Sequence, residues 1–503
     1  MKNNSITKYL LFFFLILIFT HFLPFNRSSL SPDDYALMLL PKMGLENFFI
    51  YADRPILFLW LEFQYSLLKD SIAYYFYLLI ISNYILIILC YILLNKFYSK
   101  SKSFIITVLF IVLLSKVEIY QNSIMIHINI VTSLYILSLI FLINSFKNKN
   151  YFHYFISLLL YSISIFWYEI GFFLPFLIIF ISKKNKLKIS KLKYISPFIL
   201  VMVFYSLIRL TGFFGIIENN VSHNISFNAF SGIFELFNHV IGRYFIKNLI
   251  YGLYQFLFMP IFLIFILILL NLFLFYVFQY KINFIIKNSN KSTNSLLFFI
   301  CLFILSLIPM ILNGQAGGRN LIIPSISISL FLYFFFYEYL NKKIFLNLIF
   351  ILFLFASQGN AFSHYVASNI HYSIIDSIEK NKININNADY FLFDAKSLSV
   401  NIKHSLVNNN YNLINTYFGS QVWEIWGINS ILRKMKINSN TTVLFTIENF
   451  KNKDQDFLVR YIKTQGNNMI ETHEIILKNK KIFILGYDKI YNNGFLYGLN
   501  KNE

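Results

Sequence analysis

IAYYFYLLIISNYILIILCYILLN, residues 72–95, is a run of 24 positions without one charged side chain. At 1.5 Å of rise per residue, a helix of this length is about 36 Å long, which is enough to cross the roughly 30 Å hydrocarbon core of a bilayer. Comparable apolar runs recur from the beginning of the chain to about residue 356. They predict a fold that is decided by membrane-spanning helices.

The composition of the whole chain agrees with this prediction. Of its 503 residues, 57% are hydrophobic, 20% are aromatic and only 13% are charged, a balance that is typical of membrane proteins. We therefore expect a polytopic α-helical membrane protein with about eleven transmembrane helices. The two runs on either side of Glu169 could instead form one broken helix. The expected spans are 9–24, 72–95, 103–117, 124–146, 152–168, 170–182, 194–213, 248–279, 296–312, 321–340 and 344–357.

The net charge of +20 is explained by topology and does not call for a nucleic-acid partner. If the N-terminus is cytoplasmic, the short connections on that side contain 18 lysines, whereas the longer connections on the other side contain nine basic residues. The positive-inside rule favours this orientation. The cytoplasmic connections contain no glycine-rich loop that could hold a nucleotide phosphate, so we expect the chemistry to face outward.

A change of composition after Ala356 predicts a second domain. The region becomes polar, with a helix-like stretch at 364–380 and β-like runs at 390–394, 442–447, 473–477 and 481–488. These elements predict a small extracytoplasmic α/β domain at 358–503, after a transmembrane domain at 1–357.

The first long extracytoplasmic loop, residues 31–54, contains the adjacent carboxylates Asp33 and Asp34. One explanation is capping, because an aspartate at a helix N-terminus satisfies free backbone N–H groups. Two adjacent acids also repel each other, which capping does not require. Such a pair is the setting for a general base or a divalent-cation ligand. Asp33 and Asp34 are therefore the candidate catalytic residues.

Three arginines on the same predicted side are candidates for binding a phosphate group of the substrate. Arg54 follows Asp53, and the alternative for this pair is an exposed salt bridge. Arg319 follows two glycines in GQAGGRN, where backbone amides and a guanidinium can approach one phosphate together, although the glycines could simply make the turn. Arg243 lies in the 213–247 loop. The guanidinium suits this role because its planar fork binds oxyanions in a bidentate manner.

Two acids at predicted span ends, Glu118 and Glu169, complete the candidate substrate-binding set. Acids at the membrane interface are functional candidates, but each could equally pair with a nearby cation, Lys116 or Arg209. A zinc site is not predicted, because the histidines lack the spacing of zinc ligands and both cysteines lie inside apolar runs, but a divalent cation at the aspartate pair stays possible.

Four short motifs carry a resemblance to a known family. SPDDYALM and YADRPILFLW lie in and after the first loop, KVEIYQNSIMIH follows the third span, and FWYEIGFFLPF places an acid after aromatics between two apolar runs. Together they resemble the bacterial membrane glycosyltransferases of the GT-C superfamily, especially the GtrII-like branches that modify O-antigen or lipopolysaccharide.

The resemblance implies transfer of a sugar from a polyprenyl-phosphate-linked donor to a surface glycan or lipid acceptor, with Asp33 or Asp34 as base. It implies a multi-pass protein among the lipids of the bacterial inner membrane, with its active site outside. Two alternatives remain open. An O-antigen polymerase or ligase would depend on arginines such as Arg243 and Arg319, and a lipid-linked sugar transporter or flippase would move the lipid without changing it.

Overall fold

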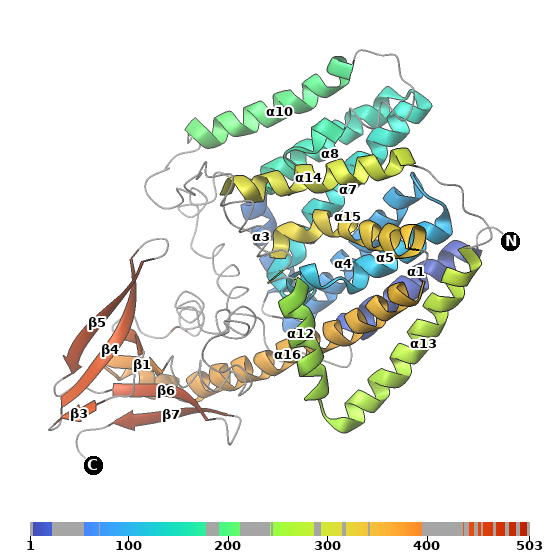
Figure 1. The fold of residues 1–503 in the computed structure, drawn as a ribbon. Helices are drawn as coiled ribbons and strands as arrows, with labels where there is room; N and C mark the ends of the chain where they lie inside the picture. The colour runs from blue at the N-terminus through green and yellow to red at the C-terminus, as the bar shows by residue number, and fades with distance from the viewer. Residues whose placement is uncertain are drawn as a thin grey trace. The chain divides into compact units, whose positions relative to one another are not determined.

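The computed structural model contains two compact units (Figure 1). Described residues up to Phe362 belong to the larger unit, and those from Ser363 onward belong to the smaller one. The described residues are 4–22, 55–69, 71–177, 191–211, 242, 245–285, 293–313, 318–340, 343–394, 436, 442–446, 451–453, 456–465, 469–477, 482–488 and 493–499.

The larger unit is a bundle of apolar helices. Local signals set their ends: Lys149, with φ of 51°, ends one helix, and the side chain of Asn150 accepts a hydrogen bond from Phe152 N at 2.9 Å and starts the next. The helices are α1 Asn4–Leu17, continued by η1 Ile18–Phe22, then α3 Pro55–Leu68, α4 Ile72–Asn95, α5 Lys100–Val112, α7 Ile126–Asn148, α8 Tyr151–Trp167, α10 Lys191–Thr211, α12 Asn248–Leu257, α13 Ile261–Ile285, α14 Thr293–Asn313, α15 Ile322–Tyr333, continued by η12 Phe334–Tyr339, and α16 Lys343–Lys380.

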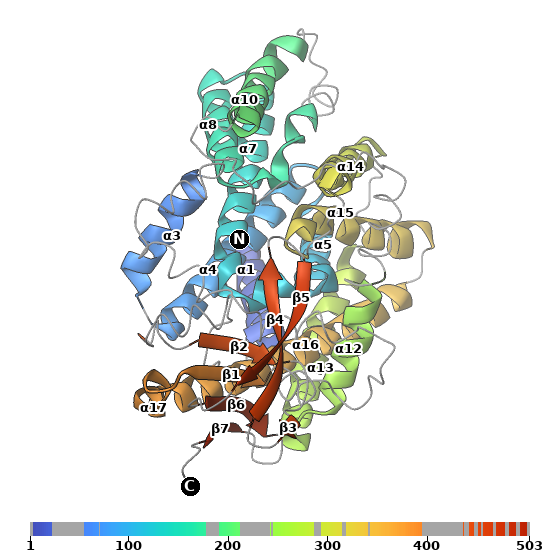
Figure 2. The same cartoon turned by 90° about the vertical axis from the view of Figure 1, so that its left-hand side faces the viewer.

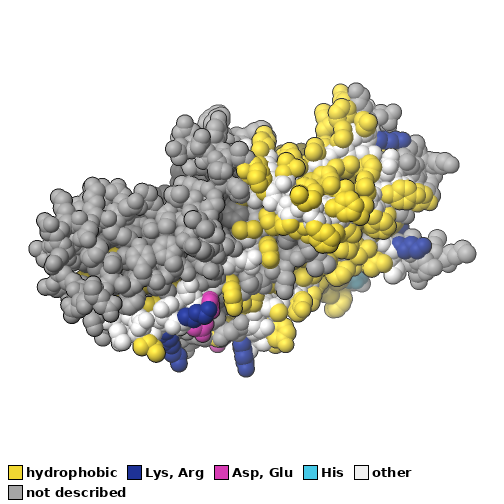
Figure 3. Space-filling view, turned by 90° about the horizontal axis from the view of Figure 1, so that it is seen from below, with side chains coloured by type: hydrophobic (Ala, Val, Ile, Leu, Met, Phe, Trp, Pro, Cys, Tyr) yellow, Lys and Arg dark blue, Asp and Glu magenta, His cyan; other side chains and the backbone are white. Residues whose placement is uncertain are grey.

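Five helices within the described residues are long and apolar enough to cross a membrane. They are Ile72–Asn95, Ile126–Asn148, Ile261–Tyr280, Ile322–Tyr339 and Lys343–Val366. Apolar side chains cover much of the described surface in Figure 3, and along α13 Ile261 is 86% exposed and Phe262 76% exposed. Surfaces of this kind fit contact with lipid tails and not with water. The fold is that of a helical membrane protein, with five further apolar helices that are shorter, Ile6–Phe22, Ile56–Leu68, Tyr151–Trp167, Tyr194–Ile208 and Leu296–Ile308.

Several expected spans differ from the observed helices. The described part of the expected 170–182 span is not a continuous helix but two 3-10 turns, η7 Glu169–Gly171 and η8 Leu174–Leu177. The expected 248–279 span is divided into α12 and α13 by a turn that ends at Pro260, which has no N–H group for a helical hydrogen bond. Helix α3 was not expected.

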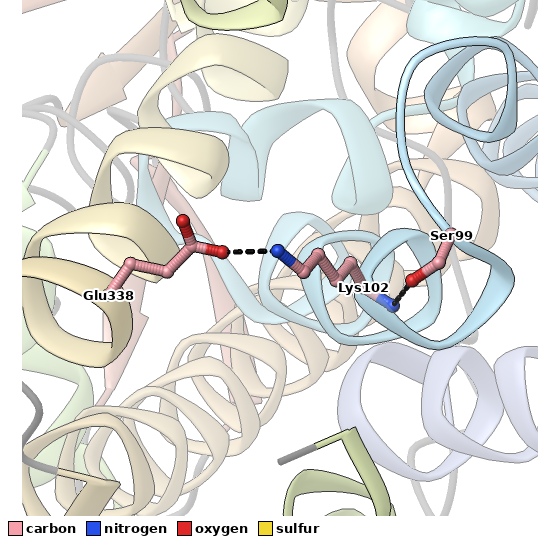
Figure 4. A network of polar contacts seen from close by, with 3 residues as sticks. All are labelled: Ser99, Lys102 and Glu338. Atoms are coloured by element: carbon pink, nitrogen blue, oxygen red, sulfur yellow. Dashed lines mark hydrogen bonds and ion pairs between the residues drawn. The ribbon is translucent and has the colours of Figure 1, made fainter. Parts of the chain in front are cut away.

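Two polar contacts set the register between α5 and α15. At one end of these helices, Lys102 Nζ lies 2.5 Å from Glu338 Oε1, and Lys102 N donates a hydrogen bond to Ser99 Oγ, which caps α5 (Figure 4). At the other end, the hydroxyls of Ser115 and Ser325 are 2.7 Å apart. Lys102 and Ser115 are 13 residues apart along the chain, and so are Ser325 and Glu338. A helix of 13 residues is about 20 Å long. The helices therefore run antiparallel.

Positive charge gathers at the Lys102 end. Lys96, which follows α4, donates a hydrogen bond from Nζ to Asn144 Oδ1 near the end of α7 at 2.8 Å. Burial, together with the nearby ammonium group of Lys147, lowers the pKa of Lys96 below its ordinary value. We call this the basic end of the bundle, and the end that contains Ser115 and Ser325 the polar-turn end.

The chain that follows α5 is irregular and buried. It forms the short elements η5 Leu114–Lys116, α6 Val117–Gln121 and η6 Ser123–Met125 before α7 begins. Backbone carbonyls at a helix end lack partners within the helix, and burying them without partners is costly. Side chains from three other elements supply hydrogen bonds: His21 Nε2 lies 3.1 Å from Ile111 O, Ser357 Oγ donates to Val112 O at 3.2 Å, and Asn248 Nδ2 donates to Leu114 O at 3.0 Å.

Helices α12 and α16 cross at two glycines. A Cβ atom at Gly359 would meet Gly252 O, and one at Gly252 would meet Ala356 O, so neither position has room for a side chain. Asn360 Nδ2 donates hydrogen bonds across the crossing to Asn248 O at 3.0 Å and within α16 to Ala356 O at 2.8 Å. Small residues that allow two backbones to approach are a common feature of helix crossings in membranes.

The smaller unit contains the last part of α16, α17 Lys382–Asn386 and a seven-stranded sheet, as far as the chain is described (Figure 2). The strands follow the order β3-β4-β2-β1-β6-β7, and β5 pairs with β4. Strand β1 is parallel to β2 and β6, and the other pairings are antiparallel. The strands are β1 Tyr390–Asp394, β2 Thr442–Thr446, β3 Lys451–Lys453, β4 Asp456–Gln465, β5 Met469–Leu477, β6 Ile482–Asp488 and β7 Asn493–Leu499.

No loop separates this unit from the bundle along the chain. The expected boundary at 357/358 falls inside α16, which continues as one helix of 38 residues from Lys343 to Lys380. The helix-like stretch at 364–380 is thus the end of α16 and not a separate helix.

Candidate functional site

The turn after α8 contains Glu169, which is the one predicted site residue whose side chain the structure describes. Helix α8 ends at Trp167 because Tyr168 has extended backbone angles, φ −163° and ψ 138°. The chain then forms η7, and the Glu169 carboxylate is half-buried.

Three tyrosines hold this turn by their hydroxyl groups, and each comes from a different helix. Tyr135 of α7 donates to Tyr168 O at 3.1 Å, and Tyr161 of α8 donates to Phe172 O at 2.8 Å. Tyr205 of α10 donates to Glu169 Oε1 at 2.8 Å. Two of the tyrosines therefore position the backbone of the turn, and the third positions the carboxylate.

The turn is also tightly packed. A Cβ atom at Gly171 would run into the ring of Tyr135, so a larger residue at this position would have to displace that ring. Phe166 and Phe172 lie against the ring of Tyr205, with centroid distances of 5.5 and 6.3 Å. These contacts fix the ring whose hydroxyl reaches Glu169 and give the carboxylate an aromatic setting.

Aromatic residues connect this turn to the start of α7 and to α3. Rings of His127 and Tyr168 lie 5.9 Å apart, and those of Trp60 and Trp167 lie 5.3 Å apart. Helices α7 and α8 run antiparallel, with Ser138 at the contact between them. The turn that contains Glu169 therefore lies at the polar-turn end, where α7 begins.

Two other predicted residues lie on short elements at this same end. Glu118 is on α6 and Arg319 is on η11, which spans Gly318–Leu321, and these two elements are in contact. The structure describes only the backbone of Glu118 and Arg319. The tertiary structure thus brings Glu118, Glu169 and Arg319 to one end of the bundle, opposite the basic end. The remaining predicted residues, Asp33, Asp34, Arg54 and Arg243, lie outside the described residues.

Sequence reasoning missed several polar residues near this end. Asn83 donates a hydrogen bond from Nδ2 to Leu79 O at 2.9 Å inside α4, and Gln121 donates from Nε2 to His21 O at 3.2 Å. A polar residue in the middle of an apolar run was the available signal for Asn83. The three tyrosines carried no such signal, because 35 tyrosines are spread along the chain.

Neither metal-ligand groups among the described residues nor comparisons with known proteins assign a function to this site. Within the part of the chain that the structure describes, no group of three His, Cys, Asp or Glu side chains could hold a metal ion. No protein-family model matches this chain, and no curated protein matches its sequence.

Proposed function

We propose that this chain is a membrane glycosyltransferase that moves a sugar from a polyprenyl-phosphate-linked donor to a surface glycan or lipid acceptor. The observation that supports the proposal most is the gathering of Glu118, Glu169 and Arg319 on short elements at the polar-turn end. Acids and an arginine at one end of an apolar bundle suit a substrate that combines sugar hydroxyls, a phosphate and a lipid tail.

In the proposed reaction, the hydroxyl oxygen of the acceptor attacks the anomeric carbon of the donor sugar. The bond from that carbon to the phosphate oxygen breaks, and the polyprenyl phosphate leaves with its negative charge. Asp33 or Asp34 takes the proton of the acceptor hydroxyl as general base. Arg54, Arg243 and Arg319 are the proposed contacts of the leaving phosphate, because a guanidinium stabilises the charge that develops there.

The proposal includes an orientation. The basic end faces the cytoplasm of a bacterium, in accordance with the positive-inside rule, and the polar-turn end faces outward across the inner membrane. About eleven spans and a small extracytoplasmic α/β domain in the C-terminal part of the chain belong to the same proposal.

A second candidate function, movement of a lipid-linked sugar, is favoured by one feature of the bundle. The chain between α5 and α7 is irregular and buried, with Ile119, Tyr120 and Gln121 all at most 1% exposed. Interrupted helices with buried, irregular backbone are typical of transporters. A flippase would use such a break as a moving part, whereas a transferase would use it only to shape the site.

Purified protein in liposomes separates the two functions. Liposomes that contain a radiolabelled polyprenyl-phosphate sugar and an acceptor glycan should yield labelled acceptor with the native protein. Asp33→Asn and Asp34→Asn proteins should insert equally well, and at least one should lose most of the transfer. Movement of the donor across the bilayer without labelled acceptor would overturn the transferase proposal. Native-level transfer by both variants would overturn the role of the aspartate pair.

A further inference from the structure

Two neighbouring tryptophans lie beside the turn that contains Glu169. Trp167 is the last residue of α8 and Trp60 lies on α3, and their ring centroids are 5.3 Å apart with the planes tilted by 44°. Each indole N–H is buried, and neither has a hydrogen-bond partner within the residues that the structure describes. A buried donor without an acceptor is costly, and most buried polar groups in folded proteins are paired. Two such donors side by side therefore indicate a place where a ligand supplies the acceptors.

The two rings connect a fixed part of the turn to an exposed part of the bundle. Trp167 is 6% exposed, and the backbone that follows it is held by the Tyr135 hydroxyl, which donates to Tyr168 O at 3.1 Å. Trp60 is only partly buried. Its ring centroid lies 5.8 Å from that of Phe63, which is 55% exposed. A ligand can therefore approach the tryptophans from the exposed face of α3.

Aromatic rings with uncharged donors suit a sugar. The C–H face of a hexose ring packs against an aromatic ring, and its hydroxyl and ring oxygens accept hydrogen bonds from N–H groups. A phosphate is disfavoured, because the charged residues nearest to the two tryptophans along the chain are the acids Glu62 and Glu169. A lipid tail has no acceptor for an indole N–H. The chemistry of this place therefore favours a hexose.

We propose that Trp60 and Trp167, which we call the tryptophan pair, bind a hexose of the donor or of the acceptor. The ring of Trp60 packs against the C–H face of the sugar, and the two indole N–H groups donate to its oxygens. The inference deepens the proposed transferase function and rests on it for the origin of the hexose. The sugar then binds next to the Glu169 turn, and the phosphate is left to the arginines.

Tryptophan fluorescence tests the class of ligand without enzymatic activity. The chain contains 4 tryptophans, so a Trp423→Phe/Trp426→Phe variant emits only from the tryptophan pair. In a detergent without a sugar headgroup, glucose, galactose or mannose should change this emission in a saturable manner. Sorbitol, a polyol without a ring, and inorganic phosphate should not. A saturable change with phosphate, or with none of these hexoses, would overturn the assignment.

The indole N–H signals test the hydrogen bonds directly. In protein with isotopically labelled tryptophan, nuclear magnetic resonance detects each indole N–H separately, and Trp60→Phe and Trp167→Phe assign the two signals. The hexose that changes the fluorescence should shift both proton signals downfield, because a hydrogen-bond acceptor deshields the proton. The signals of Trp423 and Trp426 should stay in place. A bound hexose that moves neither signal of the tryptophan pair would overturn the donor role.

Kinetic measurements in the liposome assay relate the pair to the substrate. Trp60→Phe and Trp167→Phe should each raise the KM of the hexose-bearing substrate by about fivefold, the effect expected for one neutral hydrogen bond. Tyr333→Phe is the matched control. It also removes a buried group without a hydrogen-bond partner among the described residues, but on α15, toward the Glu338 end of the bundle. Its KM should stay within about twofold of the native value.

The outcomes separate the two proposals. An unchanged KM in both tryptophan variants, or an equal rise in all three variants, would overturn the assignment of the tryptophan pair. If a hexose binds the pair in detergent but no transfer occurs in liposomes, the transferase proposal fails while the binding assignment stands. Transfer by a native protein whose tryptophan pair binds no hexose would leave the transferase proposal standing and overturn this inference.

Discussion

Removal of the Glu338 carboxylate should destabilise the bundle, because Lys102 would then hold a buried charge without its partner. The two side chains are 6% and 17% exposed and are 2.5 Å apart. Losing one member of a fully buried ion pair costs about 3–5 kcal/mol. Since Glu338 retains some access to water at the basic end, we expect Glu338→Gln to lower the free energy of unfolding by about 1–3 kcal/mol.

A double-mutant cycle measures whether this loss belongs to the pair. Glu338→Gln, Lys102→Met and the double variant would be unfolded in mixed micelles by a denaturing detergent, with helicity followed by circular dichroism. The double variant should be less destabilised than the sum of the two single variants, with a coupling of about 1–3 kcal/mol. Lys147→Met, which removes an exposed lysine at the same end, should change stability by less than about 0.5 kcal/mol. Additive effects of the two single changes would refute the expected stabilisation by the ion pair, because the pair would then contribute nothing of its own.

Two further changes test how the helices are held together. Gly359→Ala should lower the free energy of unfolding by about 1–3 kcal/mol, because the new methyl group meets the backbone of Gly252. Leu352→Ala, on an exposed part of the same helix, should lower it by less. Equal losses for the two variants would show that the helix crossing is not tightly packed. Asn271→Leu should cost about 1 kcal/mol, because the amides of Asn271 and Gln358 donate to each other at 2.8 and 2.9 Å, and the double change to leucine should recover part of the loss. A double variant that is as unstable as the sum of its parts would contradict this reciprocal pairing.

The sequence predicted the long helices well because their apolar character is continuous. The expected spans 72–95 and 124–146 correspond to α4 and α7 within two residues at each end. Hydropathy alone did not predict where a helix ends inside an apolar run. Pro260 divides one expected span, and the extended backbone of Tyr168 ends α8 before another. The expected boundary at 357/358 lies inside α16, because the composition changes along a helix that continues without a break.

For the candidate site, the sequence identified Glu169 from a single acid between two apolar runs. It could not identify Tyr205, because the pair is 36 residues apart and tyrosine is common throughout this chain. The sequence also could not show that Glu118, Glu169 and Arg319 lie at one end of the bundle. Each was a candidate by itself, and the distribution of lysines predicted only that all three lie on the extracytoplasmic side of the membrane.

The sequence by itself determined that the chain is a helical membrane protein, because the length of apolar runs and the scarcity of charge are local properties of the amino-acid sequence. Only the tertiary structure decided which helix ends meet. Lys102 pairs with Glu338, Ser115 with Ser325 and Tyr205 with Glu169, at separations in the sequence that no local pattern encodes. These contacts form because buried polar groups in an apolar bundle need partners, and the fold supplies them from distant parts of the chain.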